Sequence, residues 1–227
     1  MEFPHLKRNF SALTKEDQQK LINSKVLVVG CGGLGGYVLE ILARIGIGNL
    51  IFADGDKFEK TNLNRQILCS LITLGENKAE VAEERIKQIA PHCTPLAIPR
   101  YLKKEEVVEL GKNVHIVIDA TGGIGFKKEL LIECSKKSIP IITGAVAGFE
   151  GFVSTILPRS KIPLNFFSSN NGEGAELILG CTAPIVSIVG TLQAFEAVSF
   201  ICWNKPKVVN KVFYISLKDF SFSTFEF

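Results

Sequence analysis

Two stretches of this chain combine residue types that handle nucleotide phosphates. The first is the glycine-rich turn Gly30-Cys-Gly-Gly-Leu-Gly35, which follows a short apolar run. Gly30, Gly32, Gly33 and Gly35 lack a Cβ atom, so backbone N–H groups and the start of the next helix can approach a phosphate closely. The turn therefore indicates a nucleotide-binding site.

The second stretch begins with Asp54-Gly-Asp56, where a strand-like run ends. An acidic residue about 20 positions beyond a glycine-rich turn is the usual fingerprint of a dinucleotide-binding fold, with Asp54 accepting hydrogen bonds from ribose hydroxyls. Asp56 is open to two interpretations, as a turn-forming residue or as part of the site. These two features alone would indicate a dehydrogenase.

The residues that follow favour a triphosphate instead. Asn62, Arg65 and Gln66 place two amides and a planar cation beside the phosphate turn, and a hydride-transfer site has little use for them. Lys78 lies 13 residues past Arg65, near the start of a predicted helix. Asp119 ends a further strand-like run, where a carboxylate that holds Mg²⁺ would face the phosphates. Together these residues predict ATP and Mg²⁺ as ligands.

Strand and helix patterns alternate along the chain, which would bring these residues to one edge of a sheet. A β-branched run at 25–29, helical apolar spacing at 34–45 and a second run at 49–53 form a βαβ unit. From Glu150 onward the alternation breaks down, which indicates antiparallel additions. We therefore predict an α/β fold, a Rossmann-like doubly wound sheet that is parallel in its N-terminal part. The other expected helices are 14–24, 77–89, 104–110 and 127–137, and the other strands are 94–98, 115–118, 140–143, 151–157, 208–217 and 220–227.

The composition fits one cytoplasmic domain. The chain has 227 residues, of which 46% are hydrophobic, and this is enough for a full core. A net charge of +3 with both signs interspersed gives no basic stripe, so no nucleic-acid partner is expected. Residues 1–8 lack the apolar centre of a secretory signal, which predicts a cytoplasmic location. The most apolar window, 177–195, is broken by glycine, threonine and proline, so we expect a buried turn and helix and no membrane contact.

The cysteines and the longest loop add two further expectations. Six cysteines show no CxxC spacing, so neither disulfides nor a structural zinc ion are expected. The segment 162–174 is rich in asparagine and serine and is the longest loop-like stretch. Loops of that length in compact domains are usually functional or disordered.

In their order and spacing, these motifs resemble the ThiF/MoeB/HesA family of adenylate-forming proteins, which are kin to the catalytic domain of ubiquitin-activating enzymes. The resemblance covers nearly the whole chain, and no single motif decides it. The markers beyond the glycine-rich turn are Asp54 with Asn62-Leu-Asn-Arg-Gln66, Gly75-Glu-Asn-Lys-Ala79, Asp119-Ala-Thr121, Gly144-Ala145 with Glu150-Gly151, and the helix from Pro184 to Glu196.

The resemblance implies an activity and a partner. ATP would activate the C-terminal glycine carboxylate of a small ubiquitin-like sulfur-carrier protein of the ThiS/MoaD type, which ends in Gly-Gly, giving an acyl-adenylate and pyrophosphate. The carrier would then be loaded with sulfur for a cofactor such as thiamine or molybdopterin. The whole chain, 1–227, would be one adenylation domain, with an N-terminal arm and helix (1–24), a nucleotide-binding part (25–145) and a part for carrier binding and dimerisation (146–227).

The resemblance also implies individual roles. Arg65 and Lys78 would stabilise the phosphates, Asp119 would hold Mg²⁺, Asp54 would bind the ribose, and Gly32 would lie under the nucleotide. The family also brings an arginine from the N-terminal arm of the partner subunit. Arg8 is the residue of this chain that matches it, which implies a homodimer.

Two family features are missing from the sequence. The two CxxC pairs that hold zinc in many members are absent, so no zinc is expected. Members that form a thioester or persulfide use a cysteine ahead of the Ala-Pro that starts the long helix, where this chain has Gly174-Ala-Glu176. Cys181 is the nearest thiol, and its apolar neighbours favour a small buried residue. The sequence therefore supports adenylation and leaves open whether any cysteine takes part in sulfur transfer.

Three other functions remain as alternatives. Relatives that cyclise threonylcarbamoyladenosine in tRNA activate a tRNA-borne carboxylate at the same ATP site, although their surface is usually basic. An NAD-dependent oxidoreductase is compatible with the glycine-rich turn and Asp54, but it does not require Arg65, Lys78 or Asp119. A non-catalytic relative that binds the carrier would have an incomplete ATP site.

Overall fold

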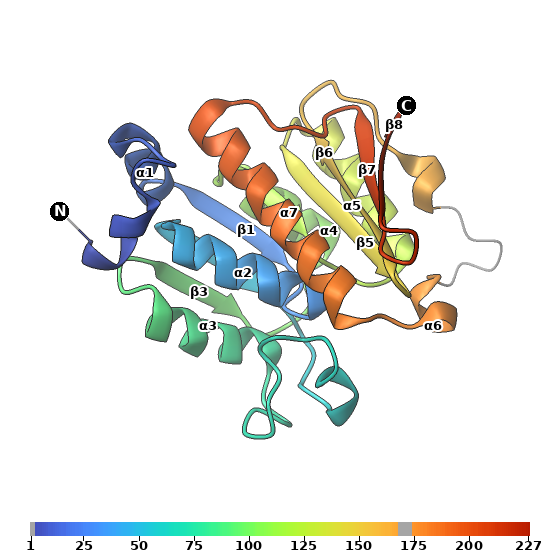
Figure 1. Cartoon of the computed structure of the whole chain (residues 1–227), viewed down its shortest axis with the longest axis horizontal. Helices are drawn as coiled ribbons and strands as arrows, with labels where there is room; N and C mark the ends of the chain where they lie inside the picture. The colour runs from blue at the N-terminus through green and yellow to red at the C-terminus, as the bar shows by residue number, and fades with distance from the viewer. Residues whose placement is uncertain (1–2, 168–173) are drawn as a thin grey trace.

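The computed structural model, which describes residues 3–167 and 174–227, contains one eight-stranded sheet with helices on both faces (Figure 1). The strand order is β3-β2-β1-β4-β5-β6-β7-β8. Strands β1 to β5 are parallel, and β6, β7 and β8 join them as antiparallel additions. The predicted fold class is therefore confirmed.

The elements follow the chain in this order. The N-terminal half contains η1 (Pro4–Asn9), α1 (Lys15–Ile22), β1 (Lys25–Val29), α2 (Gly33–Ile45), β2 (Asn49–Ala53), η2 (Lys60–Asn62), α3 (Lys78–Ile89), β3 (Thr94–Ile98) and α4 (Lys104–Gly111). The C-terminal half contains β4 (Ile116–Asp119), α5 (Ile124–Lys136), β5 (Ile141–Ala147), β6 (Glu150–Ile156), η3 (Leu164–Phe167), α6 (Glu176–Leu179), α7 (Ala183–Trp203), β7 (Lys211–Ser216) and β8 (Ser221–Glu226).

Two apolar clusters fill the space between the sheet and its helices. One lies between the sheet and α2, α3 and α7, and the other lies between the sheet and α4 and α5. The central strand β1 contributes alternate residues to the two clusters, Val26 and Val28 to the first and Leu27 and Val29 to the second. Because a strand alternates its side chains between two faces, a run of apolar residues is what a strand covered on both faces requires.

The strand register decides where the site forms. Val29 pairs with Ala53 on β2 and with Asp119 on β4, and Asp119 pairs in turn with Thr143 on β5. The carboxyl ends of three neighbouring parallel strands, β2, β1 and β4, therefore meet at one level of the sheet, and β5 continues past it to Ala147. In doubly wound folds this edge is where ligands bind.

Helix α7 is the long apolar helix that could be mistaken for a membrane span. It has 21 residues, and its length and composition would suffice to cross a bilayer. However, 61% of its most apolar window is buried inside the protein, where it packs against α2, β5 and β6. A Cβ atom on Gly190 would lie 2.9 Å from the Leu34 carbonyl oxygen, so the two helix backbones touch closely. The prediction of a core helix is confirmed for this part of the window.

Two local expectations differ from the structure, and a third is only partly described by it. Leu177, Ile178 and Leu179 on α6 are 71%, 82% and 60% exposed, so the predicted burial of the turn before α7 is wrong. Helix α5 begins three residues earlier than predicted, directly after Gly123, whose positive φ of 83° ends the preceding loop. Part of the long loop predicted at 162–174 lies outside the described residues.

Glu40 on α2 ties two neighbouring helices together. Its buried carboxylate accepts hydrogen bonds from Arg44 on the same helix and from Nε and Nη2 of Arg85 on α3, all between 2.8 and 2.9 Å. Burial raises the pKa of Glu40, but the hydrogen bonds from the two arginines outweigh it, so the pKa lies below its usual value of 4.5.

We expect Glu40→Gln to lower the free energy of unfolding by about 2 kcal/mol at pH 7, because charge-assisted hydrogen bonds are lost. Because the pKa of Glu40 is lowered in the folded state, its carboxylate is protonated there at a lower pH than in the unfolded chain. The stabilisation is therefore complete above a pH of about 5 and fades as the pH falls further. Urea denaturation at pH 7 and pH 4 measures the effect, and the variant should differ less from the wild type at pH 4.

Glu16→Gln is the matched control for this prediction. Glu16 pairs with Lys20 on α1, but its side chain is 79% exposed, so its loss should change the free energy of unfolding by less than about 0.5 kcal/mol. A Glu40→Gln variant that is equally destabilised at both pH values would contradict the assignment.

Candidate active site

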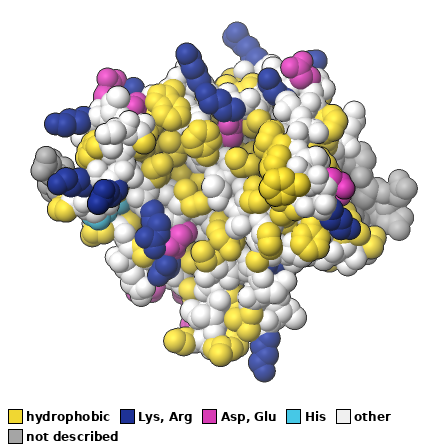
Figure 2. Space-filling view, in the orientation of Figure 1, with side chains coloured by type: hydrophobic (Ala, Val, Ile, Leu, Met, Phe, Trp, Pro, Cys, Tyr) yellow, Lys and Arg dark blue, Asp and Glu magenta, His cyan; other side chains and the backbone are white. Residues whose placement is uncertain are grey.

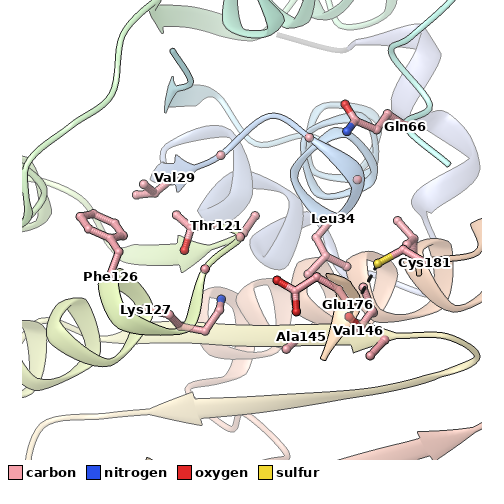
Figure 3. A pocket seen from close by; sticks show the side chains of 18 of the residues that line it. Val29, Leu34, Gln66, Thr121, Phe126, Lys127, Ala145, Val146, Glu176 and Cys181 are labelled. Atoms are coloured by element: carbon pink, nitrogen blue, oxygen red, sulfur yellow. Dashed lines mark hydrogen bonds between the residues drawn. The ribbon is translucent and has the colours of Figure 1, made fainter. Parts of the chain in front are cut away.

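The carboxyl edge of the sheet opens into a cavity of about 960 Å³. Its wall combines the turns after β1, β2 and β4 with residues of β5 and β6 (Figure 3). Nine of the twelve predicted site residues line this cavity, namely Gly30, Gly32, Gly33, Asp54, Asp56, Asn62, Arg65, Gln66 and Lys78. Gly35, Asp119 and Arg8 do not line it.

The glycine-rich turn is shaped by contacts with its own neighbours. Gly30 has a positive φ of 98°, and a Cβ atom there would lie 2.6 Å from the Ala120 carbonyl oxygen. A Cβ atom on Gly35 would lie 1.8 Å from the Gly30 carbonyl oxygen, so Gly35 is needed for packing and not for ligand contact. Gly32 and Gly33 face the cavity at the start of α2. No described side chain caps that helix, so its first N–H groups are available to an anion.

Asp54 links the turn after β1 to the turn after β2. Its carboxylate accepts the backbone N–H of Cys31 at 2.7 Å and the backbone N–H of Asp56 at 2.8 Å. Burial raises the pKa of Asp54, and the two N–H donors only partly oppose that effect. A carboxylate has further acceptor positions beyond these two, so Asp54 can still receive a hydroxyl of a ligand.

Asp56 organises the next part of the wall. One of its oxygens accepts a hydrogen bond from Lys78 Nζ at 3.0 Å, and the other accepts one from the Tyr101 hydroxyl. Lys78 thus lies at the cavity with its charge balanced by Asp56. Tyr101 belongs to no motif and was not predicted as a site residue. Its position just after β3 was a usable signal, because residues that follow parallel strands gather at this edge.

The loop after β2 supplies two amides and a cation. The Asn62 side-chain oxygen accepts the backbone N–H of Glu59 at 3.1 Å and so holds the loop. Arg65 donates to the Thr61 carbonyl oxygen at 3.0 Å and to Asn64 at 2.7 Å, which leaves part of its planar group for an anion. Gln66 Oε1 is buried at the cavity wall and has no partner among the described residues, as expected of a group that binds a ligand.

Asp119 lies beneath the cavity instead of in its wall. One oxygen accepts Thr121 N at 3.1 Å and Thr121 Oγ1 at 2.7 Å, and the other accepts Lys127 Nζ at 2.6 Å and Thr143 Oγ1 at 2.7 Å. The residue has no exposed surface. Since both oxygens already accept two hydrogen bonds each, Asp119 does not fit the role of a Mg²⁺ ligand in this arrangement.

The ion pair with Asp119 holds the Lys127 ammonium at the cavity. Lys127 is 4% exposed, lines the wall (Figure 3), and also donates to the Gly144 carbonyl oxygen at 3.0 Å. Lys127 was predicted only as part of a helix. Its spacing of eight residues from Asp119, across a short loop, gave no sign that the two side chains meet.

Cys181 is placed differently from its prediction. It lies on the cavity wall and is half-buried, packed against the apolar cluster between the sheet and α2, α3 and α7 (Figure 3), so it is less buried than predicted. Burial raises the pKa of its thiol, and a thiol that stays protonated at neutral pH is a weak nucleophile. Glu176, at the place where the family can have a cysteine, also lines the cavity (Figure 3).

Arg8 lies at the far end of α2. Its neighbour Asn9 donates to the Ile45 carbonyl oxygen at 3.1 Å, whereas Gly32 marks the other end of the helix. A helix of 13 residues spans about 20 Å, so Arg8 cannot reach the cavity of its own chain with the arm in this position.

Aromatic side chains from α5, β6, η3 and β7 form another part of the cavity wall. Sequence reasoning did not assign this wall, because its residues come from separate elements and share no motif. It is formed by Phe126, Phe152, Phe166, Phe167 and Tyr214. The wall therefore combines polar and charged groups with aromatic surface, as small-molecule sites commonly do.

Known proteins resemble this chain in sequence and in fold. A model of the ThiF family matches residues 5–227. The sulfur carrier protein ThiS adenylyltransferase of Escherichia coli K12 is 32% identical over 193 residues, covering 82% of this chain and 75% of that protein. The molybdopterin-synthase adenylyltransferase of Haemophilus influenzae is 36% identical over 188 residues, covering 81% and 76%.

Two further matches extend the comparison. The tRNA threonylcarbamoyladenosine dehydratase of Bacillus subtilis is 37% identical over 137 residues, covering 60% of this chain and 54% of that protein. The crystal structure of E. coli MccB with ATP superposes with a TM-score of 0.81 at 25% identity, covering 100% of this chain and 71% of that chain.

The fold and the site define an enzyme that transfers a nucleotidyl group. The chain belongs to the ThiF family, and it is an adenylyltransferase. Adenylyltransferases of this family use ATP.

We expect Asp119→Ala to lower the free energy of unfolding by about 3–5 kcal/mol, because it leaves the Lys127 ammonium buried without a counter-ion. Lys127→Met should cost a similar amount for the converse reason. The double variant should lose less than the sum of the two, since each single change leaves the other charge unpaired. Urea denaturation at pH 7 without metal measures all three.

Lys136→Met is the matched control for this cycle. Lys136 is on the same helix, but its side chain is 62% exposed, so the change should cost less than about 0.5 kcal/mol. An Asp119→Ala variant of unchanged stability would show that the carboxylate is not a structural counter-ion.

Proposed function

We propose that this enzyme activates the C-terminal glycine carboxylate of a small ubiquitin-like sulfur-carrier protein, in the biosynthesis of a sulfur-containing cofactor. The observation that carries the proposal is the meeting of Arg65, Lys78 and Lys127 with a glycine-rich turn in one cavity. The names of the relatives from E. coli and H. influenzae support the kind of partner.

The chemistry requires two anions to meet. A carboxylate oxygen attacks the α-phosphorus of ATP, the bond to the bridging oxygen breaks, and pyrophosphate leaves with that electron pair. Catalysis therefore depends mainly on positioning and on neutralising charge. In this proposal Arg65 and Lys78 bind the phosphates, Asp54 receives the ribose hydroxyls, and the aromatic residues of the cavity wall contact the carrier's tail.

Lys127 and Mg²⁺ complete the charge balance. Lys127 has a third N–H beyond those bound to Asp119 and Gly144, and we assign it to an oxygen of the incoming carboxylate or of the phosphates. Mg²⁺ enters with ATP, whose phosphates are its usual ligands. Glu59, Glu150 and Glu176 are carboxylates of the cavity wall, whereas Asp119 remains a counter-ion for Lys127.

The domain organisation and location belong to the same proposal. Residues 1–227 act as a single adenylation domain, with 1–24 as the arm and first helix, 25–145 as the nucleotide-binding part and 146–227 as the part for carrier binding and dimerisation. We place the enzyme in the cytoplasm, where carriers of this type and ATP are found together.

The test of function is ATP–pyrophosphate exchange. We expect exchange with a carrier that ends in Gly-Gly and none with the same carrier lacking that end. Arg65→Ala should reduce the rate by about a hundredfold or more, since a cation that neutralises transition-state charge is lost. Arg159→Ala is the control, because Arg159 is exposed and lies outside the cavity wall, and its rate should match the wild type.

Two outcomes of this test, and one outcome of a thermal melt, would overturn the proposal. An exchange rate that is the same with and without the carrier would show that the carrier is not the substrate. Exchange driven only by threonylcarbamoyladenosine in tRNA would favour the tRNA dehydratase reaction, to which the B. subtilis relative points. A larger rise in melting temperature with NAD than with Mg-ATP would favour an oxidoreductase.

We propose further that the enzyme is a homodimer in which Arg8 completes the site of the partner subunit. The arm lies about one helix length from its own cavity. Figure 2 shows apolar side chains gathered on the face that α7 crosses, and Phe195 and Trp203 of that helix remain 43% and 38% exposed. A second copy could cover such a surface.

Mixing two inactive variants tests this arrangement. Arg8→Ala and Arg65→Ala should each lack exchange activity alone. A mixture in equal amounts should regain about one quarter of the wild-type rate, because half of the dimers are mixed and each contains one intact site. A mixture that stays inactive after the subunits have exchanged would show that Arg8 does not act across subunits.

A further inference from the structure

We propose that Tyr101 is a positioning residue for the nucleotide phosphates, which holds Asp56 so that Lys78 remains available to them. This inference rests on the proposed function only in requiring ATP to occupy the cavity. It adds a residue that belongs to none of the family motifs recognised in the sequence.

The hydrogen bonds divide the Asp56 carboxylate between two donors. The Tyr101 hydroxyl donates to Oδ1, and Lys78 Nζ donates to Oδ2 at 3.0 Å. Lys78 is therefore held through one oxygen only. An ammonium has three N–H donors, and Asp56 is its one acceptor among the described residues, so two donors remain for phosphate oxygens.

The backbone beside Asp56 is shaped to receive the tyrosine ring. A Cβ atom on Gly55 would lie 2.6 Å from the Tyr101 ring, so any side chain at Gly55 would displace it. Tyr101 is 69% exposed and yet makes this close contact, and it lines the cavity. An exposed aromatic residue that is anchored by both its ring and its hydroxyl has a defined place in the site.

Removing the hydroxyl would change how Lys78 is held. Both oxygens of Asp56 would then be available to the Lys78 ammonium, which would be drawn away from the phosphates. The hydrogen bond to Asp56 raises the pKa of Tyr101 to about 12, so the hydroxyl stays protonated as a donor throughout the working pH range. The effect of losing it should therefore not vary between about pH 6 and pH 9.

The experiment compares the Kd values of ATP and adenosine for the wild type and Tyr101→Phe by titration calorimetry. We expect ATP binding to weaken about three- to tenfold, as befits the loss of one hydrogen bond. Adenosine binding should change less than about twofold, because adenosine has no phosphate for Lys78 to contact. Tyr37→Phe is the matched control, since Tyr37 is on α2, packs against Gly190 of α7 and lies outside the cavity wall.

A double-mutant cycle shows whether Tyr101 acts through Asp56. In an Asp56→Asn background, adding Tyr101→Phe should weaken ATP binding no further. If Asp56→Asn does not fold, Lys78→Met provides the same background. The melting temperature of Tyr101→Phe should equal that of the wild type.

Three results would overturn the inference. These are unchanged ATP binding, an equal loss for adenosine and ATP, and full additivity in the cycle. An equal loss for adenosine would mean that the ring contacts the nucleoside directly. Because only nucleotide binding is measured, a failure to find an active carrier would affect the proposed function and not this result.

Discussion

The rest of the site depends on the two hydrogen bonds that the Asp54 carboxylate accepts. It accepts backbone N–H groups from the turns after two neighbouring strands, at Cys31 and Asp56. These two bonds fix the glycine-rich turn relative to the loop that supplies Asp56, and Asp56 in turn holds Lys78. A buried carboxylate that orients two loops costs desolvation energy, which the hydrogen bonds from the groups it orders offset only in part.

The second anchor of the site is the ion pair of Asp119 and Lys127. It lies at the end of β4, where two threonines complete the hydrogen bonding of the carboxylate. A buried ion pair of this kind adds little net stability, because both charges lose their hydration. Removing one partner is costly, however, since the other charge is then left buried without a counter-ion. Because the pair lies directly beneath the cavity, it also holds the Lys127 ammonium in the cavity wall.

Much of the fold could be read from the sequence, because local patterns and global topology agree. The run 25–29 is apolar on both faces, as a central parallel strand must be, and the glycine-rich turn demands a helix directly after it. The least successful expectation was burial at 177–179, where apolar residues turned out to be exposed. Apolar character alone does not say whether a partner element is present to cover it. The site residues that come directly after a predicted strand could be predicted, because the alternation of strands and helices places those strand ends side by side.

The sequence by itself determined which residues gather at the carboxyl edge of the sheet, since parallel strands place their ends together whatever the details of packing. Only the tertiary structure decided what each of them does there. Asp54 and Asp119 look alike in the sequence as acids that end strands, yet one faces the cavity and the other is buried against Lys127. Tyr101 and Lys127 entered the site through contacts between segments distant in the chain or across a loop. Such contacts depend on side-chain direction and on packing between elements, and one chain's sequence encodes neither as a local pattern.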